Sequence, residues 1–163
     1  MCSSDLDRGV QIPALGGLLD SNEMHLRRAY DLIAKNGRRR VALFGLAFKP
    51  GTDDLRDSPL VGLAERLLGK GFELKIFDRF VKLSRLLGKN KEYIEAEIPH
   101  LDRLLHEDAD AVLADAEVIV IGHADAEART LILKAASGRR IVDLSGYADL
   151  RQAPGVQYEG ICW

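Results

Sequence analysis

The fold of this chain is decided by the stretch Phe48-Lys-Pro-Gly-Thr-Asp-Asp-Leu-Arg-Asp-Ser-Pro59. It follows a short apolar run, Val41-Ala-Leu-Phe44, and it ends in Asp57-Ser-Pro59, a typical helix start with a capping side chain and a proline in the first turn. A strand, a polar loop and a helix start, in that order, form a ligand-facing edge in α/β proteins. A purely structural turn seldom carries as many charged side chains as this loop does: Lys49, Asp53, Asp54, Arg56 and Asp57.

Strands and helices alternate on both sides of this loop. The apolar patterns predict strands at 40–44, 72–78, 118–121 and, as the last strand, 140–144. They predict helices from the Ser58-Pro59 start to residue 69, at 108–114, at 126–136 and, within an irregular segment at 79–99, near 91–96. Strand–helix–strand units joined by short loops imply a parallel sheet with right-handed crossovers. We therefore expect an α/β fold, a Rossmann-like parallel sheet flanked by helices.

A long helix is expected before the sheet. Apolar residues recur at spacings of three and four between Leu15 and Ile33, and Asn36-Gly37 is a typical helix end. The chain is accordingly divided into an irregular start at 1–12, a helix at 13–37 and the sheet domain at 38–163. Met24 and Leu32 add apolar surface beyond the main stripe, which indicates packing against another subunit or domain.

Composition narrows the functional classes. The net charge of −2 and the hydrophobic content of 47% are typical of an ordinary soluble globular protein and give no indication of binding to nucleic acid or to an anionic membrane. No run approaches the ~18 apolar residues of a membrane span, and residues 1–20 lack a secretory signal. Cys2 and Cys162 lie at opposite ends without disulfide-framework spacing, which favours a reducing compartment. We expect a cytoplasmic protein.

The candidate ligand-binding groups are the two cations of the loop. Lys49 and Arg56 are suited to binding phosphate. The alternative is that both pair with the neighbouring aspartates as a surface network. The turn Gly45-Leu-Ala-Phe-Lys-Pro50 lacks the second and third glycines of the G-x-G-x-x-G motif, so we do not expect the usual Rossmann cradle for a dinucleotide pyrophosphate. Asp78 ends the second predicted strand, where a ribose-binding acid often lies. Without those glycines a turn or capping role is favoured for it.

Metal and nucleophile chemistry are not favoured. The pair Asp53-Asp54 would suit magnesium, but it lies beyond the strand end and no nucleophile accompanies it. Neither cysteine lies in surroundings that would activate a thiol. His25 is expected on an exposed helix face, and His123 follows a strand end, where it either faces a ligand or, more commonly, is solvated. The histidines show no spacing typical of metal ligands: His25, His100, His106 and His123.

Several separated motifs resemble one enzyme family. The stretch 45–59 resembles the C-terminal domain of the UDP-glucose/GDP-mannose dehydrogenase family, whose members oxidise a nucleotide sugar to the uronic acid with two NAD. Asp20-Ser-Asn22 and the helix after it resemble the family's long central helix. Three segments resemble the GDP-mannose branch: Lys89-Asn-Lys-Glu-Tyr-Ile-Glu95, Ile98-Pro-His100 and Glu159-Gly-Ile-Cys-Trp163. The resemblance covers about residues 13–163, and residues before about Leu6 look foreign to the family.

The resemblance implies roles for three residues. Phe48 and Lys49 match the family positions that contact the nucleotide sugar, and Arg56 matches the position that reaches NAD, which the family holds mainly in its N-terminal domain. The family's catalytic segment, Gly-Gly-Ser-Cys-Leu-Pro-Lys-Asp, has no match in this sequence, and Cys2 has different neighbours. No catalytic residue is therefore assigned.

The expected function follows from the same resemblance. It implies the substrate-binding domain of an NAD-dependent dehydrogenase of the GDP-mannose branch, which oxidises GDP-mannose to GDP-mannuronate for alginate-type polysaccharide in a four-electron reaction. We expect this chain alone to be inactive and the helix at 13–37 to pair two subunits as a homodimer. The UDP-glucose branch and a nonenzymatic nucleotide-binding or assembly module remain alternatives. The roles of Tyr93, His100 and His123 stay open.

Overall fold

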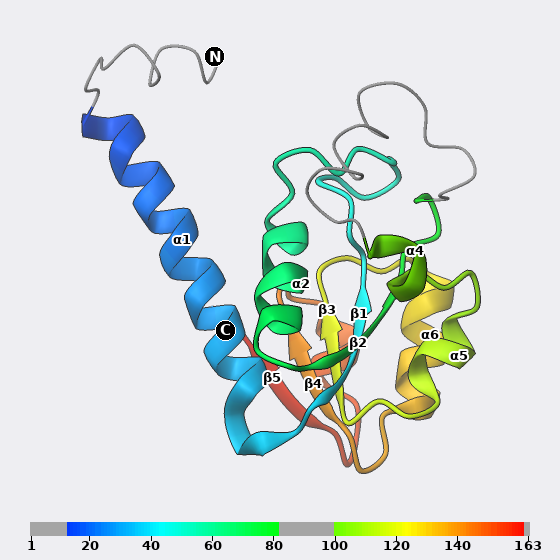
Figure 1. The fold of residues 1–163 in the computed structure, drawn as a ribbon. Coiled ribbons are helices and arrows are strands. Elements are labelled where there is room, and N and C mark those ends of the chain that lie inside the picture. The colour runs from blue at the N-terminus through cyan, green and yellow to red at the C-terminus, as the bar shows by residue number, and fades with distance from the viewer. Residues whose placement is uncertain (1–12, 82–99, 162–163) are drawn as a thin grey trace.

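Five parallel strands form one sheet in the computed structural model, which describes residues 13–81 and 100–161 (Figure 1). The expected parallel sheet and α/β fold class are confirmed. The order across the sheet is β2-β1-β3-β4-β5. The chain adds β2 on one side of β1 and then β3 on the other side, so the strand order switches between β1 and β3. Open α/β sheets bind ligands outside the carboxyl ends of the strands at such a switch point. The strands are β1 (Arg40–Phe44), β2 (Glu73–Phe77), β3 (Val118–Ile121), β4 (Arg140–Asp143) and β5 (Gln157–Gly160).

Helices cover both faces of the sheet. The expected long helix is present as α1 (Pro13–Ala34), followed by a 3₁₀ turn at Lys35–Gly37, and α1 packs with α2 (Pro59–Gly69) on one face, whereas α5 and α6 lie on the other (Figure 1). Among the described residues, none of the helices has both the length and the apolar character needed to span a membrane. The remaining helices are α4 (Leu101–Leu104), α5 (Ala109–Leu113), α6 (Ala126–Ala135) and α7 (Ala148–Arg151).

The central strands are apolar on both faces because each face has its own core. Successive side chains of a strand point to opposite sides of the sheet. Val41 and Leu43 therefore belong to the cluster under α1 and α2, while Ala42 and Phe44 belong to the cluster under α5 and α6. Strands of a parallel sheet that is covered on both faces have continuous apolar sequences. For this reason the predicted bounds of β1 and β3 match the structure.

The helix starts follow from capping side chains. Ser58 precedes α2, and its hydroxyl oxygen accepts a hydrogen bond from the Leu60 N–H at 3.3 Å, with Pro59 in the first turn as the sequence indicates. Asp108 and Asp125 cap α5 and α6 in the same way. These side chains satisfy backbone donors that a helix leaves unpaired at its start.

The prediction that 140–144 is the last strand is wrong. A further strand, β5, pairs in parallel with β4 at the edge of the sheet. Its residues, Gln157-Tyr-Glu-Gly160, are exposed or half-buried and carry no apolar alternation, because an edge strand with one partner is only partly covered. The four-residue helices α4 and α7 were also missed, since one turn is too short to show periodicity. The helix expected near 91–96 lies outside the described residues.

A buried arginine of β4 holds the C-terminal end of α1. Arg140 is 1% exposed, and its guanidinium donates to the backbone oxygens of Leu32 and Lys35 and to the Glu159 carboxylate, 2.9 Å away. The last carbonyls of a helix lack donors within the helix, and a cation is favourable there. The Lys35 ammonium also reaches Glu159, at 3.1 Å. The long helix is thereby fixed to two strands of the sheet.

A second carboxylate ties loops together at the amino edge of the sheet. Glu117 accepts the backbone N–H groups of Arg39 and Arg40, each at 3.1 Å. These bonds hold the pKa of the Glu117 carboxyl below its usual range. Residues 38–40, three consecutive arginines, thus lie at the edge opposite the polar loop, where Arg38 and Arg39 also donate to backbone oxygens.

The Glu159 contacts predict how stability depends on pH. Partial burial alone would raise the pKa of the Glu159 carboxyl, but hydrogen bonds from Arg140 and Lys35 outweigh it and lower that pKa. Stability from such a group is present above the unfolded-state pKa and is lost as pH falls through the folded-state value. We expect Glu159→Gln to lower the unfolding free energy near neutral pH, with the difference shrinking below about pH 4.

Urea unfolding of both proteins at several pH values measures this difference. Glu73→Gln, at an exposed strand position, is the matched control and should change little at any pH. A Glu159→Gln difference that stays constant into acid would contradict the assignment.

Candidate functional site

The polar loop at 45–58 leaves the carboxyl end of β1 and folds back on itself before α2. The Phe48 N–H donates to the backbone oxygen of Asp54 at 2.8 Å, and the Thr52 hydroxyl donates to the backbone oxygen of Lys49 at 2.9 Å. These bonds close a compact turn whose tip is exposed. The loop therefore presents its charged side chains from an ordered backbone.

A buried carboxylate from the next strand holds the start of the loop. Asp78 follows β2 and is 6% exposed. Its Oδ2 accepts the N–H groups of Leu46 and Ala47 at 2.8 and 3.1 Å, and its Oδ1 accepts the N–H of Phe80 at 3.0 Å. Parallel strands in register end at the same level, so Asp78 lies beside the end of β1. The turn role expected for Asp78 is confirmed.

The turn out of β1 is also confined by β3. Gly45 has φ of +85°, and a Cβ there would lie 2.7 Å from both the ring and the backbone nitrogen of His123. A residue with a side chain at this position would meet backbone strain and a clash together. Only glycine fits, which explains the one Rossmann-like glycine that the turn retains.

His123 is packed rather than solvated, so the expectation of a solvated histidine is wrong. Its side chain is 12% exposed and its Nε2 lies 3.4 Å from Asp78 Oδ2. That nitrogen has no hydrogen-bond partner among the described residues. The sequence showed only that His123 follows a strand. It did not show that β3 lies directly beside β1, which brings the imidazole against Gly45.

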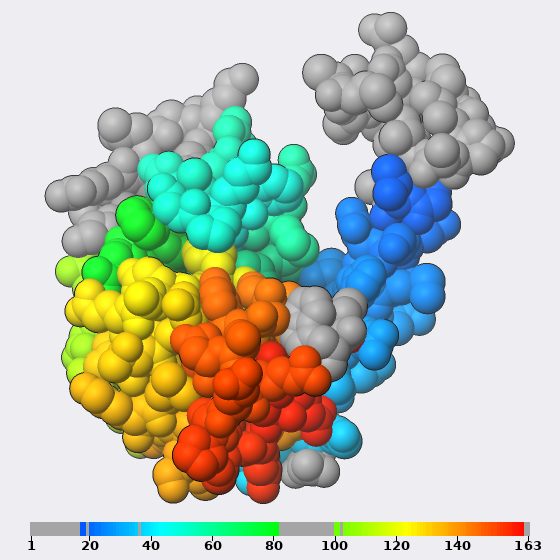
Figure 2. Space-filling model, turned by 180° about the vertical axis from the view of Figure 1, so that it is seen from behind, coloured from blue at the N-terminus to red at the C-terminus, as the bar shows by residue number. Residues whose placement is uncertain are grey.

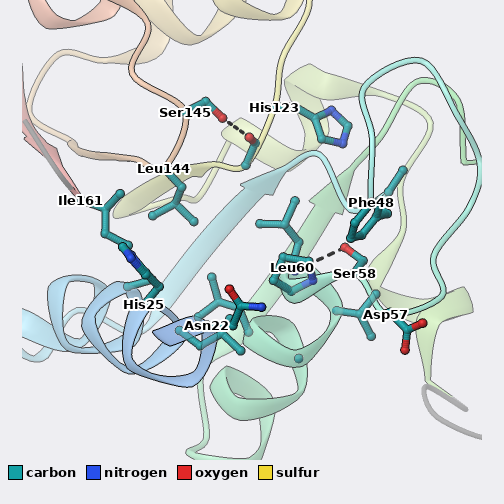
Figure 3. A pocket seen from close by; sticks show the side chains of 18 of the residues that line it. Asn22, His25, Phe48, Asp57, Ser58, Leu60, His123, Leu144, Ser145 and Ile161 are labelled. Atoms are coloured by element: carbon teal, nitrogen blue, oxygen red, sulfur yellow. Dashed lines mark hydrogen bonds between the residues drawn. The ribbon is translucent and has the colours of Figure 1, made fainter. Parts of the chain in front are cut away.

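A groove of about 1010 Å³ opens beside the loop at the carboxyl edge of the sheet (Figure 3). Its walls come from α1, from the loop and start of α2, and from the turns after β3 and β4. Segments far apart in the sequence therefore meet around one space at the switch point between β1 and β3. Its polar or aromatic side chains include Asn22, His25, Phe48, Asp57, Ser58, His123, Ser145 and Tyr147.

The rim of the groove formed by the turn after β4 is also held by a strand-end carboxylate. Asp143 is fully buried and accepts the N–H groups of Ser145, Gly146 and Tyr147 at 2.6 to 2.9 Å, together with the Tyr158 hydroxyl. No motif in the sequence marked this turn. An aspartate that ends a buried strand and is followed by Leu-Ser-Gly is the signal that could have found it.

The three predicted site residues share one loop but differ in surroundings. Phe48 is 52% exposed and lines the groove, whereas Lys49 and Arg56 lie on the loop outside the groove lining. Lys49 is exposed and forms no ion pair with any residue that the structure describes. The alternative of pairing with a neighbouring aspartate therefore does not apply to Lys49.

Arg56, in contrast, is paired. Its Nε and NH2 groups donate to the two carboxylate oxygens of Asp54 at 2.8 and 2.7 Å. This bidentate bond raises the pKa of the guanidinium and lowers that of the Asp54 carboxyl. The pair is exposed, so it orders the side chain more than it stabilises the fold. Asp54 is occupied by a cation of the protein, which weakens the magnesium alternative.

The other residues singled out in the sequence are scattered. His25 lies on the exposed face of α1, as expected, and it also lines the groove. His100 is exposed and directly precedes α4. Tyr93 lies outside the described residues. Within 13–81 and 100–161, no three His, Cys, Asp or Glu side chains are grouped to hold a metal ion.

Comparison with known proteins identifies the family. Residues 42–153 match the UDP binding domain of the UDP-glucose/GDP-mannose dehydrogenase family. This chain belongs to that family. It is 50% identical to the GDP-mannose 6-dehydrogenase of Pseudomonas aeruginosa over 161 residues, which are 99% of this chain and 36% of the relative. It is 47% identical to that of Azotobacter vinelandii over 94% of this chain and 35% of the relative. The chain thus spans about a third of these relatives.

Solved structures agree with the sequence matches. A ternary complex of GDP-mannose dehydrogenase from Pseudomonas aeruginosa superposes with a TM-score of 0.77 and 47% identity, over 99% of this chain and 36% of that one. A UDP-glucose dehydrogenase from Pyrobaculum islandicum superposes with a TM-score of 0.72 and 28% identity, over 96% and 34%. The predicted resemblance is confirmed, and the UDP-glucose branch is the more distant of the two.

Proposed function

We propose that this chain is the nucleotide-sugar-binding part of an NAD-dependent GDP-mannose 6-dehydrogenase. The observation that carries the proposal is the 50% identity over 99% of the chain to an enzyme of that name. A groove at the carboxyl edge of the sheet, next to the loop that carries Phe48 and Lys49, supports it. The enzyme would oxidise the C6 alcohol of GDP-mannose to a carboxylate, pass two hydrides to two NAD and take the second carboxylate oxygen from water. The 163 residues contain no match to the family's catalytic cysteine segment, so we infer that they bind substrate and do not oxidise it alone.

The groove and the loop divide the ligand between them. Phe48 presents a half-exposed ring at the groove, suited to packing against a base or sugar. Lys49 presents an ammonium group without an ion-pair partner among the described residues, suited to a diphosphate. Arg56, already ordered by Asp54, extends from the same loop toward a second anionic ligand, which we assign as NAD.

The binding assignment predicts a specific affinity. Calorimetric titration of the chain with GDP and with UDP should show saturable binding that favours GDP. Lys49→Ala should weaken GDP binding about 10- to 100-fold, because a hydrogen-bonded charge is lost. Lys70→Ala, an exposed lysine at the C-terminal end of α2, is the matched control and should leave the affinity unchanged. A preference for UDP would move the assignment to the UDP-glucose branch, and no saturable binding of either would overturn it.

The Arg56 assignment predicts a separate effect on the cofactor. In a complete dehydrogenase of this family that carries this sequence, we expect Arg56→Ala to raise the KM for NAD about 10-fold while changing the KM for GDP-mannose far less. Asp54→Asn breaks the same ion pair but keeps the cation, so it should leave the KM for NAD near the wild-type value. Equal effects of the two variants would show that the ion pair, and not a contact with NAD, is what matters.

We also propose that α1, with the 3₁₀ turn to residue 37, pairs two copies of the chain, and that 38–163 forms the ligand-binding domain. Leu18 and Met24 are 59% and 71% exposed on α1, whose N-terminal part projects away from the rest of the described chain (Figure 2). Single exposed apolar side chains are common on protein surfaces, so the pairing is proposed from their place on a projecting helix. Sedimentation velocity should find a dimer that Met24→Glu weakens and Met24→Leu preserves. A monomer at all concentrations would contradict the pairing.

A further inference from the structure

The path of the chain from β1 into the nucleotide-sugar loop is imposed by the neighbouring strand. Four consecutive backbone N–H groups, from Gly45 to Phe48, have fixed acceptors. The first donates to the Phe77 oxygen at 2.9 Å, the next two to the Asp78 carboxylate, and the fourth to the Asp54 oxygen. Three of these four hydrogen bonds therefore end on Phe77 or Asp78, at the end of β2. Only the fourth has its acceptor within the loop itself.

The Asp78 carboxylate is well placed to keep this path unchanged. Its side chain is 1% exposed, and the packed His123 ring lies against it. A charged acceptor bonded to backbone donors away from water makes strong hydrogen bonds, and each donor would be left unpaired without it. The next residue after this pair of donors is Phe48, and then Lys49.

We propose that Asp78, with His123 packed against it, is the positioning residue of the nucleotide-sugar loop. It sets the direction in which Phe48 and Lys49 leave the sheet, and so it sets the affinity for the ligand without touching it. This inference rests on the proposed function, since it assumes that Phe48 and Lys49 contact the nucleotide sugar.

The test compares two carboxylates, Asp78 and Glu117, which accept backbone N–H groups at opposite edges of the sheet. Asp78→Asn keeps the shape of the side chain but replaces one acceptor oxygen with a donor, so it cannot serve Phe80 and the Leu46–Ala47 pair together. Glu117→Gln makes the same change at the amino edge, where Arg39 and Arg40 donate. Both variants of the 163-residue chain are measured for GDP affinity by calorimetry, for thermal stability, and for amide hydrogen exchange.

We expect Asp78→Asn to weaken GDP binding about 10-fold or more and to speed exchange of the Leu46 and Ala47 amides. Glu117→Gln should lower the melting temperature but leave GDP affinity unchanged. Unchanged affinity in folded Asp78→Asn, or an equal loss in both variants, would overturn the positioning role. If Asp78→Asn does not fold, His123→Ala replaces it. Removing the His123 ring exposes the Asp78 carboxylate to water, which should speed hydrogen exchange at the Leu46 and Ala47 amides. Unchanged exchange would overturn the proposal.

Failure of the proposed function gives a different result. It would show as no GDP binding by the wild-type chain. Amide exchange then still decides whether Asp78 holds the loop. Faster exchange confined to 45–48 in Asp78→Asn supports the positioning role of Asp78, and exchange unchanged there overturns it.

Discussion

The site depends on one buried interaction, the Asp78 carboxylate with the backbone N–H groups of Leu46 and Ala47. It exists because β2, β1 and β3 are parallel and in register, so their carboxyl ends lie side by side. A carboxylate buried there needs donors, and the chain leaving β1 needs acceptors. Gly45 and His123 also restrict the path of the chain after β1, because the two residues pack so closely that no side chain fits at position 45. The charged loop is thereby presented next to the groove.

A second anchoring contact gives the groove its other wall. Asn22 and His25 line it from α1, a helix that precedes the sheet in sequence and packs mainly along α2. Arg140 joins the last turn of α1, through the Leu32 oxygen, to Glu159 on the edge strand. The lining of the groove runs from Asn22 to Ile161, so the groove requires both α1 and the segment after β5 to be in place. Its geometry follows from how the sheet and helix dock, and not from one contiguous motif.

The sequence predicted the parts of this structure whose signal is local. Two strands, 40–44 and 118–121, were predicted correctly because they are covered on both faces and read as continuous apolar runs. The charged loop indicated the ligand edge for a similar reason. The sequence could not show long-range contacts. Arg140 bonds to backbone oxygens more than one hundred residues away, and His123 packs against the turn after β1, a strand that is not adjacent to β3 in sequence. The sequence of the loop, with two cations and three aspartates, also does not show which cation pairs with which aspartate.

The central claim is that the nucleotide sugar binds at the loop and groove beside the carboxyl ends of β1 and β3. The most direct test is a titration of the ¹⁵N-labelled chain with GDP-mannose, followed by NMR. We predict that the largest shift changes fall on the amides of 45–49 and on α1 around Asn22 and His25. Changes concentrated at the separate hollow formed by 149–156 and the end of α6, or none at saturating ligand, would contradict it.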